Sequence, residues 1–263
     1  MGTATQLEFC RTQRDGRILT VAIDRPAVMN SLHPPANFEL EKVFDEFAAD
    51  DDLWVAIITG AGDRAFSAGN DLKFQAQAGA RLEIPKTGFA GLTARYDLYK
   101  PVIAAVNGVA MGGGFEIALA CDLIVASDGA VFALPEPRVG LAALAGGMHR
   151  LPRQIGLKHA MGMLLTGRRV SAEEGRALGF VNEVVPAGDL MAAARRWADQ
   201  IVECAPLSVR ASKQCALDGL RHGSIEEAMA ERYDQLSAMA RSDDFIEGPR
   251  AFAEKRKPAW KGR

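Results

Sequence analysis

The order of apolar and polar residues along the chain changes character near its midpoint. Residues 17–24 (RILTVAID) are rich in β-branched and aliphatic side chains and follow the turn pair Asp15-Gly16, which predicts a hairpin strand. The run 53–59 (LWVAIIT) is almost continuously apolar, as expected of a strand buried on both faces. Similar runs predict three further strands at 102–106, 122–126 and 131–134.

Helical periodicity appears once in the first half and dominates from about residue 147 onward. Within 38–49, apolar residues recur on one helical face and charges occupy the other. In the second half, Asp189 and Ser224 stand where each can cap a helix, and Glu227 completes a capping box with Ser224. This pattern predicts an α/β body followed by a helical tail, with no linker between them.

Length and charge restrict the classes of function. The 263 residues allow one large domain or two small ones. There are 31 Lys and Arg residues against 33 Asp and Glu, so the net charge of −2 gives no reason to expect a nucleic-acid partner. The one compositional excess is glycine, at 26 residues.

Membrane, metal and redox chemistry find little support in the sequence. The uncharged stretch 101–115 is 15 residues long, shorter than the ~20 that a membrane helix needs. The four histidines show no ligand spacing, so we expect no metal. The four cysteines lie far apart without a C-x-x-C pair, which indicates free thiols and a reducing compartment, by default the cytoplasm.

The densest glycine cluster is Gly112-Gly113-Gly114, between the strand predicted at 102–106 and a potential helix at 115–120. Glycines there leave backbone N–H groups open at a helix N-terminus, where a phosphate or a developing oxyanion is favoured. A dinucleotide loop is excluded because Ile117 stands where its third glycine is required. Tight strand–helix packing is the alternative explanation of the triplet.

A second candidate segment is 65–73 (AFSAGNDLK). Ser67 does not fit a nucleophile elbow, because the pattern G-x-S-x-G requires glycine where Ala65 stands. A simple loop is the alternative.

Two carboxylates stand near these segments. Glu116 follows the glycine triplet, and Glu136 lies between Pro135 and Pro137, whose rings stiffen the backbone. Both have apolar neighbours, and burial would raise a carboxyl pKa into the range useful for acid–base catalysis. The alternatives are a helix-dipole partner for Glu116 and a solvated loop residue for Glu136.

Together these segments resemble the enoyl-CoA hydratase/isomerase (crotonase) superfamily over nearly the whole chain. The resemblance rests on IDRPAVMNSL, VAIITGAGDRAFSAGNDLK, KPVIAAVNGVAMGGGFEIALACDLIVAS, FALPEPRVGL, LLTGRRVSAEEGRALGFVNEVV and EGPRAFAEKRKPAWKGR. Within the superfamily, residues 88–93 (GFAGLT), FALPE and the ending PAWKGR are most similar to carnitinyl-CoA dehydratases.

The resemblance implies a role for each matching residue. The N–H groups of Asn70 and Gly113 correspond to an oxyanion hole for a thioester carbonyl, and Glu116 and Glu136 to the two glutamates of hydratases. The residues expected to bind the CoA thioester are Ala68, Asn70, Asp71, Leu72, Lys73 and Gly113. The basic residues near the C-terminus, Lys255 and Lys257 among them, are expected to contact the CoA moiety.

The implied fold is a ClpP/crotonase spiral of repeated β-β-α units. We therefore expect a crotonase-like core over 1–200 and a helical oligomerisation region over 201–263, forming trimers or hexamers. The implied activity is a hydro-lyase that adds or removes water across the α,β double bond of an acyl-CoA, as in fatty acid metabolism. No cofactor is implied beyond the CoA that enters with the substrate.

One departure and three alternatives remain. Many hydratases read P-G-A-G-G-T where this chain has 140–147 (GLAALAGG), a segment that lines the acyl pocket in the family. The acyl group is therefore open, and a carnitinyl-CoA dehydratase is one specific form of the main interpretation. The others are another crotonase reaction, such as Δ3-Δ2 isomerisation or C–C hydrolysis, and a non-catalytic, RNA-associated binding protein.

Overall fold

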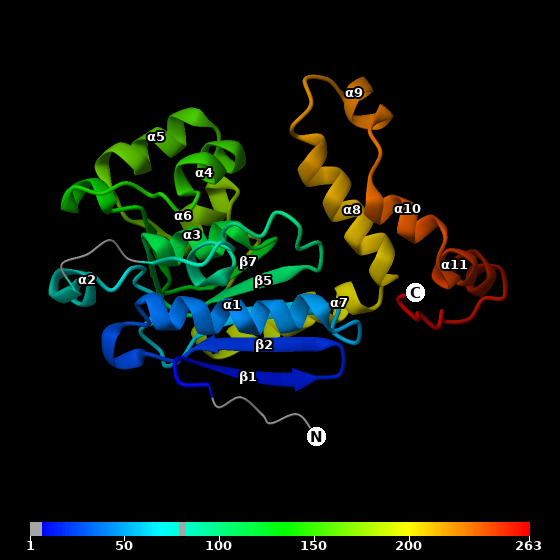
Figure 1. Cartoon of the computed structure of the whole chain (residues 1–263), viewed down its shortest axis with the longest axis horizontal. Coiled ribbons are helices and arrows are strands. Elements are labelled where there is room, and N and C mark those ends of the chain that lie inside the picture. Colours follow the sequence, from blue (N-terminus) through cyan, green and yellow to red (C-terminus); the bar gives the residue numbers. More distant parts are fainter. Residues whose placement is uncertain (1–6, 79–82) are drawn as a thin grey trace.

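The computed structural model describes residues 7–78 and 83–263, and within them the strands form two sheets (Figure 1). The larger sheet has the order β1 (Cys10–Asp15), β2 (Ile18–Ile23), β3 (Val55–Gly60), β5 (Val102–Val106), β7 (Leu123–Ser127) and β10 (Glu183–Val185). The smaller sheet has the order β4 (Ala65–Ser67), β6 (Val109–Met111), β8 (Val131–Ala133) and β9 (Val170–Ser171). All neighbours are parallel except β1 with β2 and β8 with β9.

The chain passes repeatedly from the larger sheet to the smaller one and then into a helix. The first pass is β3, β4 and α2 (Leu72–Ala78), and the second is β5, β6 and α3 (Gly113–Ala120). The third is β7 and β8, followed by the 3-10 turn η3 (Glu136–Val139), α4 (Gly147–Ile155) and α5 (Leu157–Thr166). This arrangement confirms the predicted spiral of β-β-α units.

The apolar run of β3 is explained by its two packing partners. Val55 and Ile57 belong to a core cluster with α7 (Leu190–Val202), whereas Ala56 and Ile58 face the main core, which includes α1 (Pro34–Ala49). Since successive strand residues point to opposite faces, a strand between two apolar layers is apolar at most positions. The one hydroxyl in β3, that of Thr59, donates a hydrogen bond to the Ala105 carbonyl at 2.8 Å. The predicted burial of β3 on both faces is thus confirmed.

The local predictions have mixed outcomes. The hairpin at Gly16 and the capping box of Ser224 and Glu227, which begins α9 (Ile225–Ala230), are confirmed. Asp189 is the N-cap residue of α7 (Leu190–Val202), as predicted, but the expected capping bond from its side chain is absent. The 3-10 turn η4 (Ala187–Asp189) leads directly into α7, so Asp189 already has helical backbone angles and its side chain makes no capping hydrogen bond.

The second half is also less uniformly helical than its periodicity indicated. The short strands β9 and β10 flank α6 (Ala172–Leu178) and pair with β8 and β7. Strands of two and three residues are too short for a period to be visible in the sequence.

The last helices stand apart from the two-sheet body (Figure 1). We call residues 206–263 the C-terminal arm; it contains α8 (Pro206–Gly219), α9, α10 (Asp234–Ala240) and α11 (Asp243–Ala253). The predicted division at residues 200 and 201 falls near the end of α7 and stays a prediction; residues 1–6 and 79–82 of its first part lie outside the described residues. Within the described chain, every helix is too short or too polar to cross a bilayer.

Candidate active site

The loop after β4 and the start of α3 meet backbone to backbone. A Cβ on Gly69 would lie 2.6 Å from the Met111 carbonyl oxygen and 2.8 Å from the Gly113 nitrogen. The φ of Gly69 is +83°, a conformation that side chains disfavour. A Cβ on Gly114 would collide with the Ser67 carbonyl. Only glycine permits this approach, which brings Asn70 and Gly113 together.

The N–H groups of Asn70 and Gly113 at this contact make no hydrogen bond to any described residue. Next to Asn70, the Leu32 N–H donates to the Gly69 carbonyl at 2.8 Å and the Asp71 N–H donates to the Leu32 carbonyl at 3.0 Å. Gly113 is the first residue of α3, where an N–H has no partner within the helix and carries the positive end of its dipole. The pair is available to a ligand oxygen.

Glu116 lies one turn into α3 and is 3% exposed. Its Oε1 accepts a hydrogen bond from the Gly147 N–H at 2.8 Å. Burial raises the pKa of Glu116 to about 7 and the charge of Glu136 adds to that rise, while the Gly147 N–H and Arg150 oppose it. A carboxyl with such a pKa exchanges protons near neutral pH.

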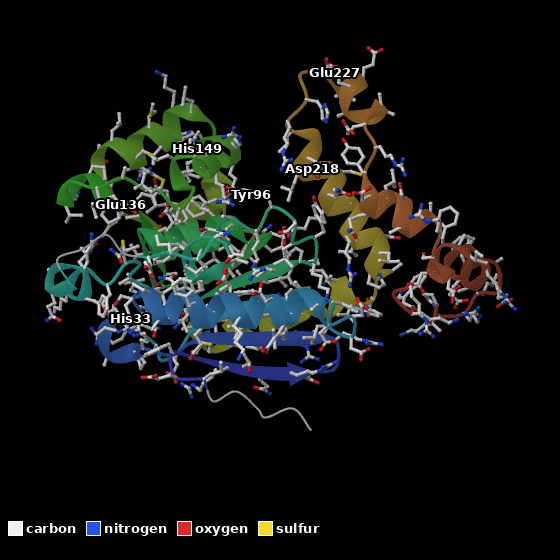
Figure 2. All side chains as sticks on the ribbon, in the orientation of Figure 1. His33, Tyr96, Glu136, His149, Asp218 and Glu227 are labelled. Atoms are coloured by element: carbon white, nitrogen blue, oxygen red, sulfur yellow. The ribbon has the colours of Figure 1, made fainter. Side chains whose placement is uncertain are left out.

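Glu136 is the first residue of η3, which follows β8 after Leu134 and Pro135, in the body beside α5 (Figure 2). Its Oε2 is buried and has no hydrogen-bond partner among the described residues. Burial raises the pKa of this carboxyl as well. A Cβ on Gly112 would lie 2.9 Å from Glu136 Oε1, so the glycine triplet is in contact with both the open N–H groups and the second glutamate.

A cavity of about 360 Å³ opens beside Glu136. Its other lining residues are apolar: Ala142 and Ala143 come from the predicted acyl-pocket segment, and Met161, Leu164 and Leu165 come from α5. The cavity can therefore hold the apolar part of a ligand whose reacting group lies between Glu116 and Glu136.

The remaining predicted binding residues are found in the loop that carries Asn70. The Ala68 N–H donates to the Met29 carbonyl at 2.9 Å. The Asp71 carboxylate accepts from the Phe74 N–H at 3.1 Å and pairs with Arg25 at 3.1 Å, so it orders the loop. Leu72 and Lys73 are exposed at the start of α2.

Sequence reasoning missed three contributors to this site. Gly147 supplies the N–H to Glu116, Arg25 fixes Asp71, and the Phe89 ring lies where a Cβ on Gly113 would come within 2.6 Å of it. The glycine pair at 146–147 was a visible signal, but the sequence assigned it only to the acyl pocket. Arg25 and Phe89 lie in segments that carry the family resemblance, but no signal in those segments gave either residue a role.

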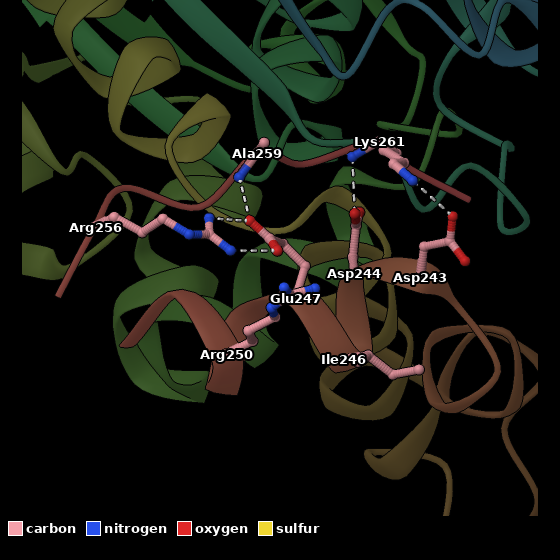
Figure 3. Close-up of a pocket in the computed structure, with 8 residues that line it drawn as sticks. All are labelled: Asp243, Asp244, Ile246, Glu247, Arg250, Arg256, Ala259 and Lys261. Carbon is pink, nitrogen blue, oxygen red and sulfur yellow. Dashed lines mark hydrogen bonds and ion pairs between the residues drawn. The ribbon is translucent and has the colours of Figure 1, made fainter. Parts of the chain in front are cut away.

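The basic tail is not brought to this site within one chain. Arg256 pairs with Glu247 and Lys261 with Asp243 around a separate cavity of about 420 Å³ in the C-terminal arm (Figure 3). The arm and α2, which follows Asn70, lie at opposite ends of the molecule (Figure 1).

Comparison with known proteins places the chain among relatives of one kind. The family model described as enoyl-CoA hydratase/isomerase matches residues 13–263. Carnitinyl-CoA dehydratase from Citrobacter koseri is 46% identical over 259 residues, covering 95% of this chain and 97% of that protein. The corresponding protein of Proteus mirabilis is 45% identical over 257 residues, covering 94% and 96%.

Solved structures agree with this placement. Enoyl-CoA hydratase from Mycobacterium tuberculosis superposes with a TM-score of 0.90 at 38% identity, covering 97% of this chain and 99% of that one. The enoyl-CoA hydratase of Mycobacterium marinum gives a TM-score of 0.90 at 40% identity, with the same coverage.

Proposed function

Because the chain belongs to the enoyl-CoA hydratase/isomerase family, we propose that it is a hydro-lyase that adds water to, or removes it from, the α,β position of an acyl-CoA thioester. The observation that carries the proposal is a pair of glutamates beside the Gly112–Gly114 turn, Glu116 buried and Glu136 half-buried. Glu116 has a pKa of about 7, and Glu136 has an orphaned buried oxygen.

In the hydration direction, Glu116 takes a proton from water as the water oxygen bonds to Cβ of the enoyl group. The electron pair of the double bond moves toward the thioester carbonyl, whose oxygen becomes negative. The N–H groups of Asn70 and Gly113 stabilise that oxygen, and loss of one such donor typically costs about 10²–10³ in rate. Protonated Glu136 then delivers a proton to Cα, and dehydration reverses these steps.

The hydrogen bonds distinguish the two glutamates. Glu116 accepts the Gly147 N–H, which holds this carboxylate in place and supports its role as the base. Burial raises the pKa of Glu136, and no described residue donates a hydrogen bond to its Oε2, which supports its role as the group that carries a proton to the substrate. Each role requires only a carboxyl group, so the mechanism calls for no metal or redox cofactor.

The acyl group is the finer part of the proposal. The names of the relatives favour carnitinyl-CoA as a second candidate, and a carnitinyl group carries a quaternary ammonium. Apart from Glu136, the described residues that line this cavity are aliphatic residues, a proline and two methionines, and none of them carries an aromatic ring for a cation. We therefore place an uncharged aliphatic acyl group first.

A panel of substrates tests both the hydro-lyase activity and the choice of acyl group. Purified protein is mixed with crotonyl-CoA, longer straight-chain enoyl-CoA esters and crotonobetainyl-CoA, and loss of the conjugated-thioester absorbance is followed. We expect hydration of the uncharged esters with the higher kcat/KM. Preference for crotonobetainyl-CoA would favour the second candidate, and no hydration of any ester would reject the hydro-lyase.

Assembly and location complete the proposal. The C-terminal arm is proposed to join copies into a trimer or hexamer, which would let the Lys255 and Lys257 region of one copy reach CoA bound by another. Its exposed apolar residues support this, among them Ile225, Met229 and Phe252.

The four unpaired cysteines support a reducing compartment such as the cytoplasm.

A further inference from the structure

Arg150 is a half-buried cation that the mechanism above does not use. It lies on α4, about one helical turn after Gly147, and its guanidinium folds back toward the start of the helix. Its Nη1 donates to the Ala145 carbonyl at 3.4 Å, and its Nη2 donates to the Thr93 carbonyl at 2.8 Å. A Cβ on Gly146, where φ is +107°, would collide with the guanidinium.

The two segments that Arg150 joins support different parts of the site. Residues 145–147 end in the N–H that Gly147 donates to Glu116. Thr93 closes the turn of η2 (Phe89–Gly91), because its Oγ1 accepts the Phe89 N–H at 2.8 Å. The ring of Phe89 in turn packs against Gly113. The Arg150 side chain therefore connects the segment that donates to Glu116 with the turn that places the Phe89 ring beside Gly113.

The charge of Arg150 also acts on Glu116. The charged groups that influence Glu116 are Glu136 from η3, which disfavours its ionised form, and Arg150 from α4, which favours it. Besides Glu116, the titratable groups that face Arg150 are Tyr96 and Cys121. Without the guanidinium, Glu136 would be the remaining charged influence, and the pKa of Glu116 would rise.

We propose that Arg150 is a positioning residue of the hydratase reaction. It fixes the position of the Gly147 N–H relative to the Phe89 ring beside Gly113, and it keeps Glu116 available as a base. The inference rests on the proposed function for its kinetic consequences. Arg150 does not touch the reacting atoms. Its effect is transmitted through Ala145, Thr93 and the charge on Glu116.

Three variants separate the hydrogen bonds of Arg150 from its charge. Arg150→Gln removes the charge and the guanidinium that bonds the two carbonyls. Arg150→Lys keeps the charge but replaces the planar guanidinium. Arg153→Gln is the matched control, since Arg153 is exposed on the same helix and its one hydrogen bond to a described residue is the bond to the His149 carbonyl. The readouts are kcat and KM for crotonyl-CoA hydration between pH 5 and 9, with thermal unfolding as a check on folding.

For Arg150→Gln we expect kcat to fall by about 10-fold to 100-fold with KM changed little, as for displaced catalytic groups. The acid limb of its kcat profile should move up by about half a pH unit to one unit, because the ionised base loses a favourable charge. Arg150→Lys should lose kcat while the limb stays near that of the wild type. Arg153→Gln should match the wild type in both.

Wild-type kcat and an unmoved acid limb in Arg150→Gln would overturn the inference. So would a loss of kcat in that variant without any shift of the limb. If Arg150→Gln does not fold, Arg150→Lys decides, and unchanged kcat there counts against the positioning role.

An infrared titration of the protonated carboxyl band that Glu116→Gln removes provides a test without turnover. Its midpoint should be higher in Arg150→Gln than in the wild type. If the wild-type protein hydrates no thioester, the proposed function fails while this midpoint still tests Arg150, and an equal midpoint would contradict the inference.

Discussion

Burial destabilises the charged form of Glu116 and so couples its chemistry to the stability of the fold. The folded protein holds this proton up to a pH of about 7, whereas the unfolded chain releases it near 4.5, the ordinary pKa of a glutamate. Between these values the native state binds more protons than the unfolded state, so the free energy of unfolding falls as pH rises. Below 4.5 the group has no such effect, and above 7 its effect is complete.

Glu116→Gln should therefore stabilise the protein at pH 8 relative to pH 5. Glutamine can accept the same Gly147 N–H but is never charged, so the variant avoids a cost on the order of 3 kcal/mol at most. Urea unfolding at the two pH values measures the difference between variant and wild type. If the free energy of unfolding differed between variant and wild type by the same amount at pH 5 and at pH 8, the pKa of Glu116 would not be raised in the folded protein.

The elements that hold the site were predictable to different degrees. The strand β5 and the helix α3 were visible because their signals are local: an apolar run and a glycine triplet before a helix-forming segment. The bond from Gly147 to Glu116 was not, because it joins residues 31 apart whose pairing depends on how α4 packs on α3. The basic tail likewise shows its charge in the sequence, but Glu247 and Asp243 pair with Arg256 and Lys261 only once the arm has folded.

The loop between β4 and α2 offers a test of how Asn70 is held. Asp71→Ala removes the bond to the Phe74 N–H and the ion pair with Arg25, whose side chains are 11% and 16% exposed at that contact. We expect kcat/KM for enoyl-CoA esters to fall about 10-fold or more, because the Asn70 N–H is displaced from the thioester oxygen. Steady-state kinetics with crotonyl-CoA measures this effect.

Asp63→Ala is the matched control for that loop. Asp63 lies in the exposed turn between β3 and β4, and its substitution should leave kcat/KM unchanged. Equal activity of Asp71→Ala and Asp63→Ala would mean that the ion pair does not order Asn70.

The shape of the whole molecule indicates that one chain is not the complete assembly. The C-terminal arm leaves Met229 81% exposed and Phe252 87% exposed, and it lies at the end of the molecule opposite α2 (Figure 1). Apolar surface of this kind, gathered on one projecting element, is typical of an interface.

Light scattering at micromolar concentration should accordingly give three or six times the 28.2 kDa of one chain. Burial of the apolar residues of the arm between copies is the physical reason. A monodisperse monomer would remove both the predicted assembly and the proposed contact of Lys255 and Lys257 with CoA on another copy.

The two-glutamate mechanism is tested most directly by the rate of crotonyl-CoA hydration in Glu116→Gln and Glu136→Gln. Both substitutions are nearly isosteric, so binding of CoA should survive while kcat falls by about 10²–10⁴, the usual contribution of a general acid or base. Because both groups act on one reacting unit, the double variant should be little slower than the slower single one. Near-wild-type hydration by Glu116→Gln would contradict the account and favour an isomerase that works with a single glutamate.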